Sequence, residues 1–427
     1  MAFEGRLRTQ SRLHRLTRFR TIFVGEPRFV DGNRTLYLVD GRDHLAWMLA
    51  AIGSARRRVD LEIYILRPDA SGVRVRDALA AAARRGVVVR VIYDSVGSGE
   101  LDDAFFEPLR AAGVHLVEFN PLAPWRLRIG RLGRQSWEPN QRDHRKLLVC
   151  DVPLAWADAA MDAGPSPPDA FAGDEASATT ILAITGGRNI ADEYLGKAPG
   201  EGQWRDSGLV VTGPIGVSLD ALFTAMWAHA AGPPVDAPAL ESGATGSDAI
   251  IALGTQPGRM NLLQWAMARI AAATANELRI SCAYFIPSLR WRRALRAAAR
   301  RTGACKVVIP LHNDIPVVAA ASRYFLGGLL RGGVQIYRYA RAVLHDKTIV
   351  YDQAVTILGS SNVDQRSFRL NYELSLVILA PSLARTIARF HDGDIEASEP
   401  YTLEAWHARP FWGRVFDWFW SLFRNQL

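Results

Sequence analysis

The feature that most constrains this chain is a strand–helix–strand unit that occurs twice. The first copy runs through VDLEIYIL, VRDALAAAARRG and VVVRVIYD in residues 59–94, where the apolar pattern indicates strand, helix and strand, and Gly86 ends the helix. The same order recurs in ELRISCAYFI, RWRRALRAAARRTG and CKVVIP, and aligning Tyr64 with Tyr284 superimposes strand on strand and helix on helix. Because a duplication on this scale fixes the architecture, we predict two similar α/β domains.

The chain is long enough for both domains, and a linker separates the two copies. Its 427 residues suit two domains, and the stretch AGPPVDAPALESGATGSDA at residues 231–249 is rich in Pro, Gly, Ala and Ser. The predicted divisions are a basic N-terminal segment (1–35), a first domain (36–232), a linker (233–249), a second domain (250–400) and an aromatic C-terminal tail (401–427).

Each copy also carries one sparse motif: His, any residue, Lys, four residues, Asp. It reads HRKLLVCD at residues 144–151 and HDKTIVYD at residues 345–352. In a strand, His and Lys two positions apart face the same side, whereas the Asp seven positions after the His faces the opposite side. We therefore expect the two aspartates to brace the local fold. The candidate catalytic residues of the motifs are His144, Lys146, Asp151, His345, Lys347 and Asp352.

Lysine usage supports a function for these motifs. Lys and Arg together number 51, yet only four are lysine, and two of the four occupy the motifs. A compact ammonium is not interchangeable with a planar guanidinium. A single His–Lys pair on a strand usually has no function, but two complete motifs in a duplicated chain favour one. We interpret the seven other histidines, His391 among them, as surface or core residues.

The residue types indicate phosphoryl transfer without a metal ion or a cofactor. A phosphodiester needs a nucleophile, an acid for the leaving oxygen, and positive charge on the other oxygens. Two histidines supply the first two, and two lysines with Asn189 in GGRN and Asn362 in GSSN supply the third. A carboxylate behind each imidazole would fix its tautomer. No HxxxH or CxxC spacing indicates metal ligands.

The spacing between motif and asparagine reveals an insertion in the first copy. One insertion of about 28 residues accounts for the greater separation of Asp151 from Asn189 than of Asp352 from Asn362. It covers about residues 152–180, contains five acidic residues and no basic one, and follows the strand of the first motif. It could line the entrance to the site.

HRKLLVCD with TGGRNIADEYL, and HDKTIVYD with LGSSNVDQRSFRLNYEL, resemble the paired motifs of the phospholipase D superfamily. The bacterial cardiolipin synthase branch is the more similar one, also through EIYILRPDASG, WRDSGLVVTGP and YFIPS. The resemblance implies two α/β halves, each a mixed sheet flanked by helices, with one active site at their pseudo-twofold interface. It also implies a covalent phosphohistidine that is transferred to an alcohol or to water.

The resemblance assigns a role to each candidate residue. His144 would be the nucleophile, and His345 the general acid and then the base. The predicted phosphate-binding residues are Lys146, Lys347, Asn189, Asn362 and Ser360, and the predicted histidine-orienting residues are Asp206 and Glu373.

Charge and the aromatic tail indicate a membrane-surface enzyme. The net charge of +8 suits a partner that carries phosphates, and no apolar run reaches the ~18–20 residues that span a bilayer. The tail PFWGRVFDWFWSLFRNQL places Trp412, Val415, Phe416, Phe419 and Phe423 on one helical stripe, typical of an interfacial helix, although packing onto the core is the alternative. We expect a peripheral protein on the cytoplasmic face of the membrane.

These patterns together predict a phosphatidyltransferase of the cardiolipin synthase type. Its partners would be phosphatidylglycerol or a similar phospholipid and an anionic membrane surface. The alternatives are a phospholipase D that releases phosphatidic acid, and a nuclease of the same superfamily. We expect no nucleic-acid partner, because no basic stretch interleaved with aromatic residues lies near the motifs.

Overall fold

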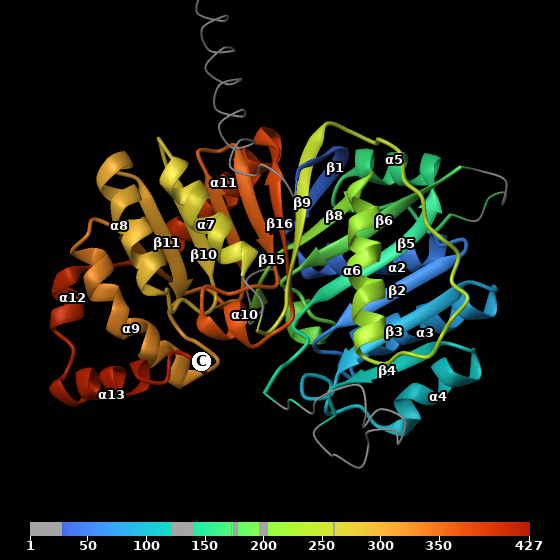
Figure 1. Cartoon of the computed structure of the whole chain (residues 1–427), viewed down its shortest axis with the longest axis horizontal. Coiled ribbons are helices and arrows are strands. Elements are labelled where there is room, and N and C mark those ends of the chain that lie inside the picture. The colour runs from blue at the N-terminus through green and yellow to red at the C-terminus, as the bar shows by residue number, and fades with distance from the viewer. Residues whose placement is uncertain are drawn as a thin grey trace, which may run out of the picture.

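A computed structural model of the chain describes residues 28–121, 138, 140–171, 173, 178–195, 204–258 and 261–427. One 15-stranded sheet crosses the whole molecule, and helices cover both of its faces (Figure 1). The arginine-rich stretch at residues 6–20, which belongs to the predicted N-terminal segment, lies outside the described residues.

The order of the strands shows the duplication directly. The first half has the order β1-β8-β6-β5-β2-β3-β4, and the second repeats it as β9-β16-β15-β14-β10-β11-β12, with β17 added at the edge. Parallel pairs join β2, β3 and β4, while the strands nearer the junction pair antiparallel, so each half is a mixed sheet. The predicted fold class is therefore confirmed. The strands of the first half are β1 (Val30–Leu38), β2 (Arg58–Ile63), β3 (Val88–Asp94), β4 (His115–Phe119), β5 (Lys146–Pro153), β6 (Thr179–Gly186), β7 (Trp204–Arg205) and β8 (Gly208–Thr212). Those of the second half are β9 (Asp248–Thr255), β10 (Leu278–Cys282), β11 (Cys305–Pro310), β12 (Gln335–Tyr339), β13 (Val343–Leu344), β14 (Lys347–Tyr351), β15 (Val355–Gly359), β16 (Glu373–Leu379) and β17 (Ser398–Tyr401).

Helices complete a three-layer arrangement in each half. In the first half, helices α2 to α5 cover one face of the sheet and α6 crosses the other (Figure 1). In the second half, α7 to α9 cover one face and α11 covers the other. Their bounds are α2 (Gly41–Ser54), α3 (Ala70–Arg84), α4 (Asp103–Ala111), α5 (Leu154–Ala163), α6 (Ile215–His229), α7 (Leu262–Ala273), α8 (Leu289–Thr302), α9 (Pro316–Leu330), α10 (Gln365–Arg369), α11 (Pro381–Glu396), α12 (Leu403–His407) and α13 (Phe411–Ser421), with a 3-10 turn at Asp192–Tyr194.

The two halves meet at β1 and β9. These strands pair antiparallel only at their start, where Asn33 lies opposite Asp248, and β1 then leaves β9. A buried apolar cluster crosses the junction and includes Leu147 of β5 and Val350 of β14. The junction therefore places the two motif-bearing strands in one continuous core.

The predicted strand–helix–strand units are present, with shifted ends. Helix α3 begins before VRDALAAAARRG, because Asp69 caps it by accepting a hydrogen bond from the Gly72 amide. Strand β2 ends before the predicted YIL, because the Ile65 amide bonds Asn189 Oδ1 instead of a neighbouring strand. The predicted boundary of the first domain at residue 36 is wrong, since it falls inside β1.

The insertion forms helix α5 and packs on the first half. Its Trp156 ring lies 6.3 Å from Trp47 of α2. The insertion leaves β5 at Pro153, whereas His144 lies before the opposite end of this strand, nine residues or about 30 Å away along the extended chain. Only beyond the helix does Pro165 reach the seam between the halves, where it lines a pocket. That the insertion lines the entrance to the site stays a prediction, and it now concerns only the segment after α5 that contains Pro165.

The aromatic tail forms α13, which lies along α9 at the outer edge of the second half (Figure 1). Within the part of the chain that the structure describes, no helix combines the length and apolar character needed to cross a bilayer.

Candidate active site

The two motif histidines lie at the start of equivalent strands. His144 lies two positions before Lys146, the first residue of β5, and His345 lies two positions before Lys347, the first residue of β14. Both imidazoles are buried, with 9% of His144 and 4% of His345 exposed.

Backbone pairing across the junction brings the histidines of the two halves to one place. The His144 amide donates to the Tyr372 carbonyl oxygen of the second half (2.9 Å), and the His345 amide donates to the Arg205 carbonyl oxygen of the first half (2.8 Å). In the second case β7 and β13 form a small parallel ladder. The backbone of each histidine therefore bonds the residue just before an acidic residue of the other half, which is Glu373 for His144 and Asp206 for His345.

Those carboxylates bind the histidines crosswise. His144 Nδ1 lies 3.0 and 3.1 Å from the two carboxylate oxygens of Glu373, the first residue of β16. His345 Nδ1 lies 2.6 Å from Asp206 Oδ2 in the segment between β7 and β8. Both carboxylates have no exposed surface. The pairing predicted for Asp206 and Glu373 is present as contacts, and each contact joins the two halves.

Burial and these partners set the protonation of the histidines. Burial lowers the pKa of His144 to about 4, although Glu373 acts in the opposite direction. Burial also lowers the pKa of His345, and Lys347 lowers it further, against Asp206. Lys347 lowers the pKa of His144 and Lys146 that of His345, so the charges of both halves act on one site.

The same balance keeps the carboxylates ionised. Burial raises the pKa of Glu373, but His144, Lys146 and Ser360 outweigh it, and the pKa lies below its usual value. In Asp206, the effect of burial is likewise outweighed by Lys347 and His345. Each carboxylate can thus accept the Nδ1 proton of its histidine, which leaves Nε2 as the ring atom that can react, with a lone pair in the neutral ring and a proton in the imidazolium.

The two lysines are buried beside their histidines. Lys146 Nζ donates to the His144 carbonyl oxygen (2.7 Å) and lies 5.2 Å from the centre of the Tyr64 ring. Lys347 Nζ lies 2.8 Å from His345 Nδ1 and 3.7 Å from Asp206 Oδ2. Burial lowers the pKa of Lys146 to about 7. Two buried amino groups thus lie beside the histidines, and their role at phosphate stays a prediction.

The predicted phosphate-binding asparagines lie behind the tyrosines of the repeat. Asn189 Oδ1 accepts from the Ile65 amide (3.1 Å), and Asn362 Oδ1 accepts from the Tyr284 amide (3.3 Å). Both side chains thus hold the segment after β2 or β10. Their role at phosphate stays a prediction.

Ser360 does not fit the predicted phosphate contact. Its side chain is fully buried and its hydroxyl donates to Glu373 Oε2, while it accepts from the Leu374 amide (3.0 Å). The structure therefore corrects the prediction: Ser360 holds the carboxylate that holds His144. At the other carboxylate, Gly187 leaves the space that Asp206 occupies, because a Cβ at this position would lie 2.2 Å from Asp206 Oδ1.

Asp151 and Asp352 complete the motifs but do not reach the site. Asp151 accepts from the backbone amides of Arg57 and Arg58 (2.9 and 2.8 Å) at the far end of β5. Asp352 accepts from the amides of residues 275–277 at 2.7 to 3.2 Å, in a turn where its own φ is +50°. Their inclusion among catalytic residues is corrected: they hold the turns before β2 and β10, as the strand geometry implied.

Aromatic rings that the sequence did not assign to the site form its walls. Tyr64 lies 4.9 Å from His144 between ring centres, and Tyr284 lies 6.2 Å from His345. Trp204 and Tyr194 lie 4.9 and 6.1 Å from His345. The alignment of Tyr64 with Tyr284 was the signal that could have found the first pair, because both follow the equivalent strand.

A further layer of buried charge supports the motifs. Arg145 reaches the Glu373 carbonyl oxygen (3.3 Å) and lies 3.6 Å from Glu62. Behind His345, Asp346 accepts from Thr348 (2.6 Å) and lies 3.8 Å from His391, whose burial agrees with its interpretation as a core residue. Among the described residues, no group of three or more His, Cys, Asp or Glu side chains is arranged to hold a metal ion.

Comparison with known proteins relates most of the chain to phospholipid enzymes. A family model described as "Cardiolipin synthase, PLD-like domain" matches residues 48–195 and again residues 267–394. The cardiolipin synthase of Alkalihalophilus pseudofirmus is 30% identical over 391 residues, 90% of this chain and 70% of the relative. The major cardiolipin synthase of Bacillus subtilis is 30% identical over 396 residues, 91% and 74% of the two chains. The crystal structure of a Haemophilus influenzae phosphatidylserine synthase shares the fold, with a TM-score of 0.65, 13% identity and coverage of 92% and 95%.

Proposed function

This chain belongs to the cardiolipin synthase family of phospholipase D-like proteins, and we propose that it joins two molecules of phosphatidylglycerol. It is a phosphatidyltransferase of the cardiolipin synthase type and acts on phospholipids. The proposal adds the donor, the acceptor and the residues that transfer the group. The observation that carries it is the crosswise pair of contacts His144–Glu373 and His345–Asp206, which leaves both Nε2 atoms free to act.

In the first half-reaction His144 attacks the donor. Its Nε2 lone pair forms a bond to phosphorus, and the bond from phosphorus to the glycerol oxygen breaks. His345 enters the reaction as an imidazolium that the Asp206 carboxylate holds at Nδ1, and it gives its Nε2 proton to that oxygen, so glycerol leaves as a neutral alcohol. Lys146 and Lys347 stabilise the oxygens of the phosphoryl group as charge builds up on them.

In the second half-reaction His345 takes a proton from the hydroxyl of a second phosphatidylglycerol. The acceptor oxygen forms a bond to phosphorus, the bond from phosphorus to His144 breaks, and the phosphatidyl group leaves on the new alcohol. One residue therefore serves as acid and then as base. The site favours a lipid alcohol over water because rings and apolar side chains exclude bulk solvent from it.

We propose that α13 carries the enzyme onto an anionic membrane surface. Four of the five residues of the predicted stripe are exposed: Trp412 is 78% exposed, and Phe416, Phe419 and Phe423 are 43 to 48% exposed, while Val415 is half-buried. The opposite side of the helix is fixed to the protein by Asp417, which is buried and bonds Arg323 (2.8 Å). An aromatic face held outward by a buried ion pair is typical of an interfacial helix.

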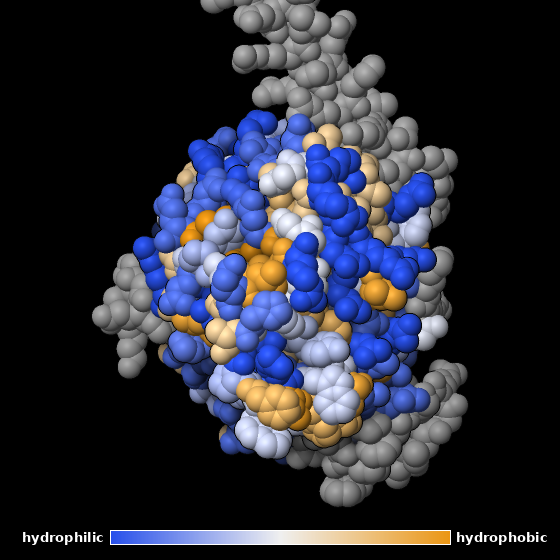
Figure 2. Space-filling model, turned by 90° about the vertical axis from the view of Figure 1, so that its left-hand side faces the viewer, coloured by the Kyte–Doolittle hydropathy of each residue, from blue (hydrophilic) through white to orange (hydrophobic). Residues whose placement is uncertain are grey.

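Basic side chains lie near the end of the tail. Burial and the charge of Arg424 lower the pKa of Arg292 on helix α8, and this helix also carries exposed arginines at 290, 293 and 300. Figure 2 shows apolar side chains at the lower edge of this side of the molecule, with hydrophilic ones above. Each cation near an anionic surface contributes about 1 kcal/mol.

The tail also connects this face with the active site. Arg366 of α10 donates its amide to the Leu427 carbonyl oxygen (3.2 Å) and its guanidinium to that of Gln426 (3.2 Å). Helix α10 follows the turn that carries Asn362. A bilayer on α13 therefore lies close to the site, which supports a peripheral position; we propose the cytoplasmic face.

The test is incubation of the purified protein with vesicles of labelled phosphatidylglycerol. Diphosphatidylglycerol with an equal amount of glycerol is the expected result. Phosphatidic acid as the only product would instead make the protein a hydrolase, and cleavage of DNA without action on lipid would make it a nuclease. The variants His144→Ala and His345→Ala serve as inactive controls.

A further inference from the structure

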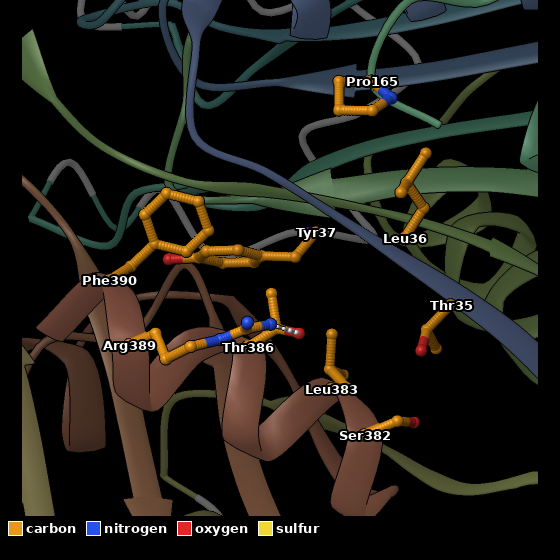
Figure 3. Close-up of a pocket in the computed structure, with 9 residues that line it drawn as sticks. All are labelled: Thr35, Leu36, Tyr37, Pro165, Ser382, Leu383, Thr386, Arg389 and Phe390. Atoms are coloured by element: carbon orange, nitrogen blue, oxygen red, sulfur yellow. Dashed lines mark hydrogen bonds between the residues drawn. The ribbon is translucent and has the colours of Figure 1, made fainter. Parts of the chain in front are cut away.

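The seam between the halves holds a groove that the reaction described above does not use. Its outer part is a pocket of about 530 Å³ between β1 and α11, closed by Pro165 of the insertion (Figure 3). Its inner part is a pocket of about 470 Å³ that shares Tyr37, Pro165 and Phe390 with the first. We call the two together the seam groove.

The sheet itself creates this space. Strand β1 pairs with β9 at Val30 and Asn33 and then leaves it, so the stretch from Thr35 to Tyr37 stays paired with β8 on one edge and faces α11 on the other. In Figure 3 the Tyr37 and Phe390 rings lie side by side at one end, and Pro165 faces them from across the pocket. Arg34 of β1 forms an ion pair with Asp162 of α5, which fixes the insertion in this place.

The inner part reaches the walls of the active site. Trp204 and Tyr194 line it, and these are the rings at 4.9 and 6.1 Å from His345. The seam groove therefore extends from α11 to the two rings that border His345.

Its polarity changes along its length. The inner part is lined by three arginines and two aspartates, whereas Arg389 is the one residue with a formal charge among those that line the outer part. The outer walls are otherwise rings, aliphatic side chains and hydroxyls: Thr35, Leu36, Tyr37, Pro165, Ser382, Leu383, Thr386 and Phe390. A phospholipid has the same gradient, with a charged headgroup followed by an apolar chain.

We propose that the seam groove binds one acyl chain of a phospholipid whose phosphate is processed at His144 and His345. The inference rests on the proposed function for the identity of the ligand. The phosphate lies at the histidines, the polar ester region passes Trp204 into the charged inner part, and the end of the chain lies against Leu36 and Leu383. Both volumes lie in the range of pockets that bind small molecules, about 300 to 1,000 Å³.

The first experiment fills the outer pocket. Thr386→Trp introduces an indole into it, and Arg385→Trp places the same ring on the adjacent, exposed position of α11 as a matched control. Rates are measured with dioleoyl and with dihexanoyl phosphatidylglycerol in the same detergent micelles. Thr386→Trp should lower the ratio of long-chain to short-chain rate at least about tenfold, the scale of a misfit in an apolar pocket, and the control should not. An unchanged ratio in Thr386→Trp would overturn the proposal.

The second experiment does not need turnover. Phosphatidylglycerol with a diazirine at the end of one chain is irradiated with the unmodified protein, and the labelled peptides are identified. Label in residues 30–38 or 381–390 is expected, with its loss in Thr386→Trp; label confined to other segments would overturn the proposal. If neither lipid were turned over, the proposed function would be wrong, while the crosslinks would still decide whether the groove holds a chain.

Discussion

Replacing Glu373 by Gln tests whether the crosswise carboxylate controls the reacting histidine. Both Glu373 oxygens lie within 3.1 Å of His144 Nδ1, and each also accepts a hydrogen bond, Oε2 from Ser360 and Oε1 from Asn371 at 3.4 Å. A glutamine in this place keeps the size but replaces one oxygen by a donor. In one orientation the amide NH2 meets the Ser360 hydroxyl, and in the other it meets the Asn371 NH2, so a donor faces a donor in both. The amide NH2 also donates to His144 Nδ1, which favours the tautomer that has its proton on Nε2.

The expected loss is large because the reacting atom itself is blocked. A comparable carboxylate-to-amide change behind a catalytic histidine lowers kcat about 10,000-fold. We expect Glu373→Gln to lose about 1,000- to 10,000-fold, which corresponds to about 4 to 5.5 kcal/mol of barrier. The charge of Glu373 also raises the pKa of His144, which burial holds at about 4. Without that charge the pKa falls further, so the acid limb of kcat/KM moves to lower pH.

The assay combines initial rates of diphosphatidylglycerol formation with acid quenching of labelled enzyme. Phosphohistidine on the peptide that contains His144 should decrease with the rate. Glu399→Gln is the matched control, because Glu399 is exposed and pairs only with Arg338 (3.0 Å) in the contacts of the described chain. Thermal melting verifies the fold. An activity of Glu373→Gln within about tenfold of the unmodified enzyme would refute the reasoning.

Further predictions concern charge, fold and membrane attachment. Because burial lowers the pKa of Lys146 to about 7, kcat/KM of the free enzyme should fall as pH rises above that value. The variant Lys146→Arg should be strongly impaired, and its pH profile should lack this decrease at high pH. A decrease that remained in the variant would contradict its assignment to Lys146. Activity should survive dialysis against a strong chelator, and a loss that added metal reverses would contradict the proposed chemistry. Asp352→Ala should lower the free energy of unfolding by about 3 kcal/mol, since it removes the acceptor of three backbone hydrogen bonds of about 1 kcal/mol each, with little change in rate per folded molecule. An inactive but stable protein would give Asp352 a chemical role. Removing residues 410–427, or changing Trp412 and Phe416 to Ser, should release the protein from anionic vesicles in a flotation assay. The control variant Val217→Ser, on an exposed position of α6, should stay bound. If the truncated chain melted at a much lower temperature, the tail would be part of the core packing.

Local patterns in the sequence were sufficient to predict the repeated architecture. The alternation in β3 and β11 and the helix pattern ended by Gly303 at φ +67° depend on neighbours along the chain, so they can be read without the fold. The same holds for Asp352, because a residue seven positions after a histidine in a strand faces away from it. The ends of β2 and α3 were harder to predict, since Asn189 and Asp69 determine them through single hydrogen bonds.

The sequence by itself determined that two halves exist, that each contributes a histidine and a lysine, and that carboxylates are available for both. Tertiary structure decided that Glu373 of the second half binds His144 of the first, and Asp206 of the first binds His345 of the second. It also decided that Ser360 lies behind Glu373, that the stripe on α13 faces outward, and that β1 leaves β9 to open a groove. The physical reason is that periodicity along a chain assigns a residue to a face of its own strand or helix. Which faces of the two halves come into contact depends on how the halves pair at β1 and β9. That pairing joins segments that lie far apart in the sequence.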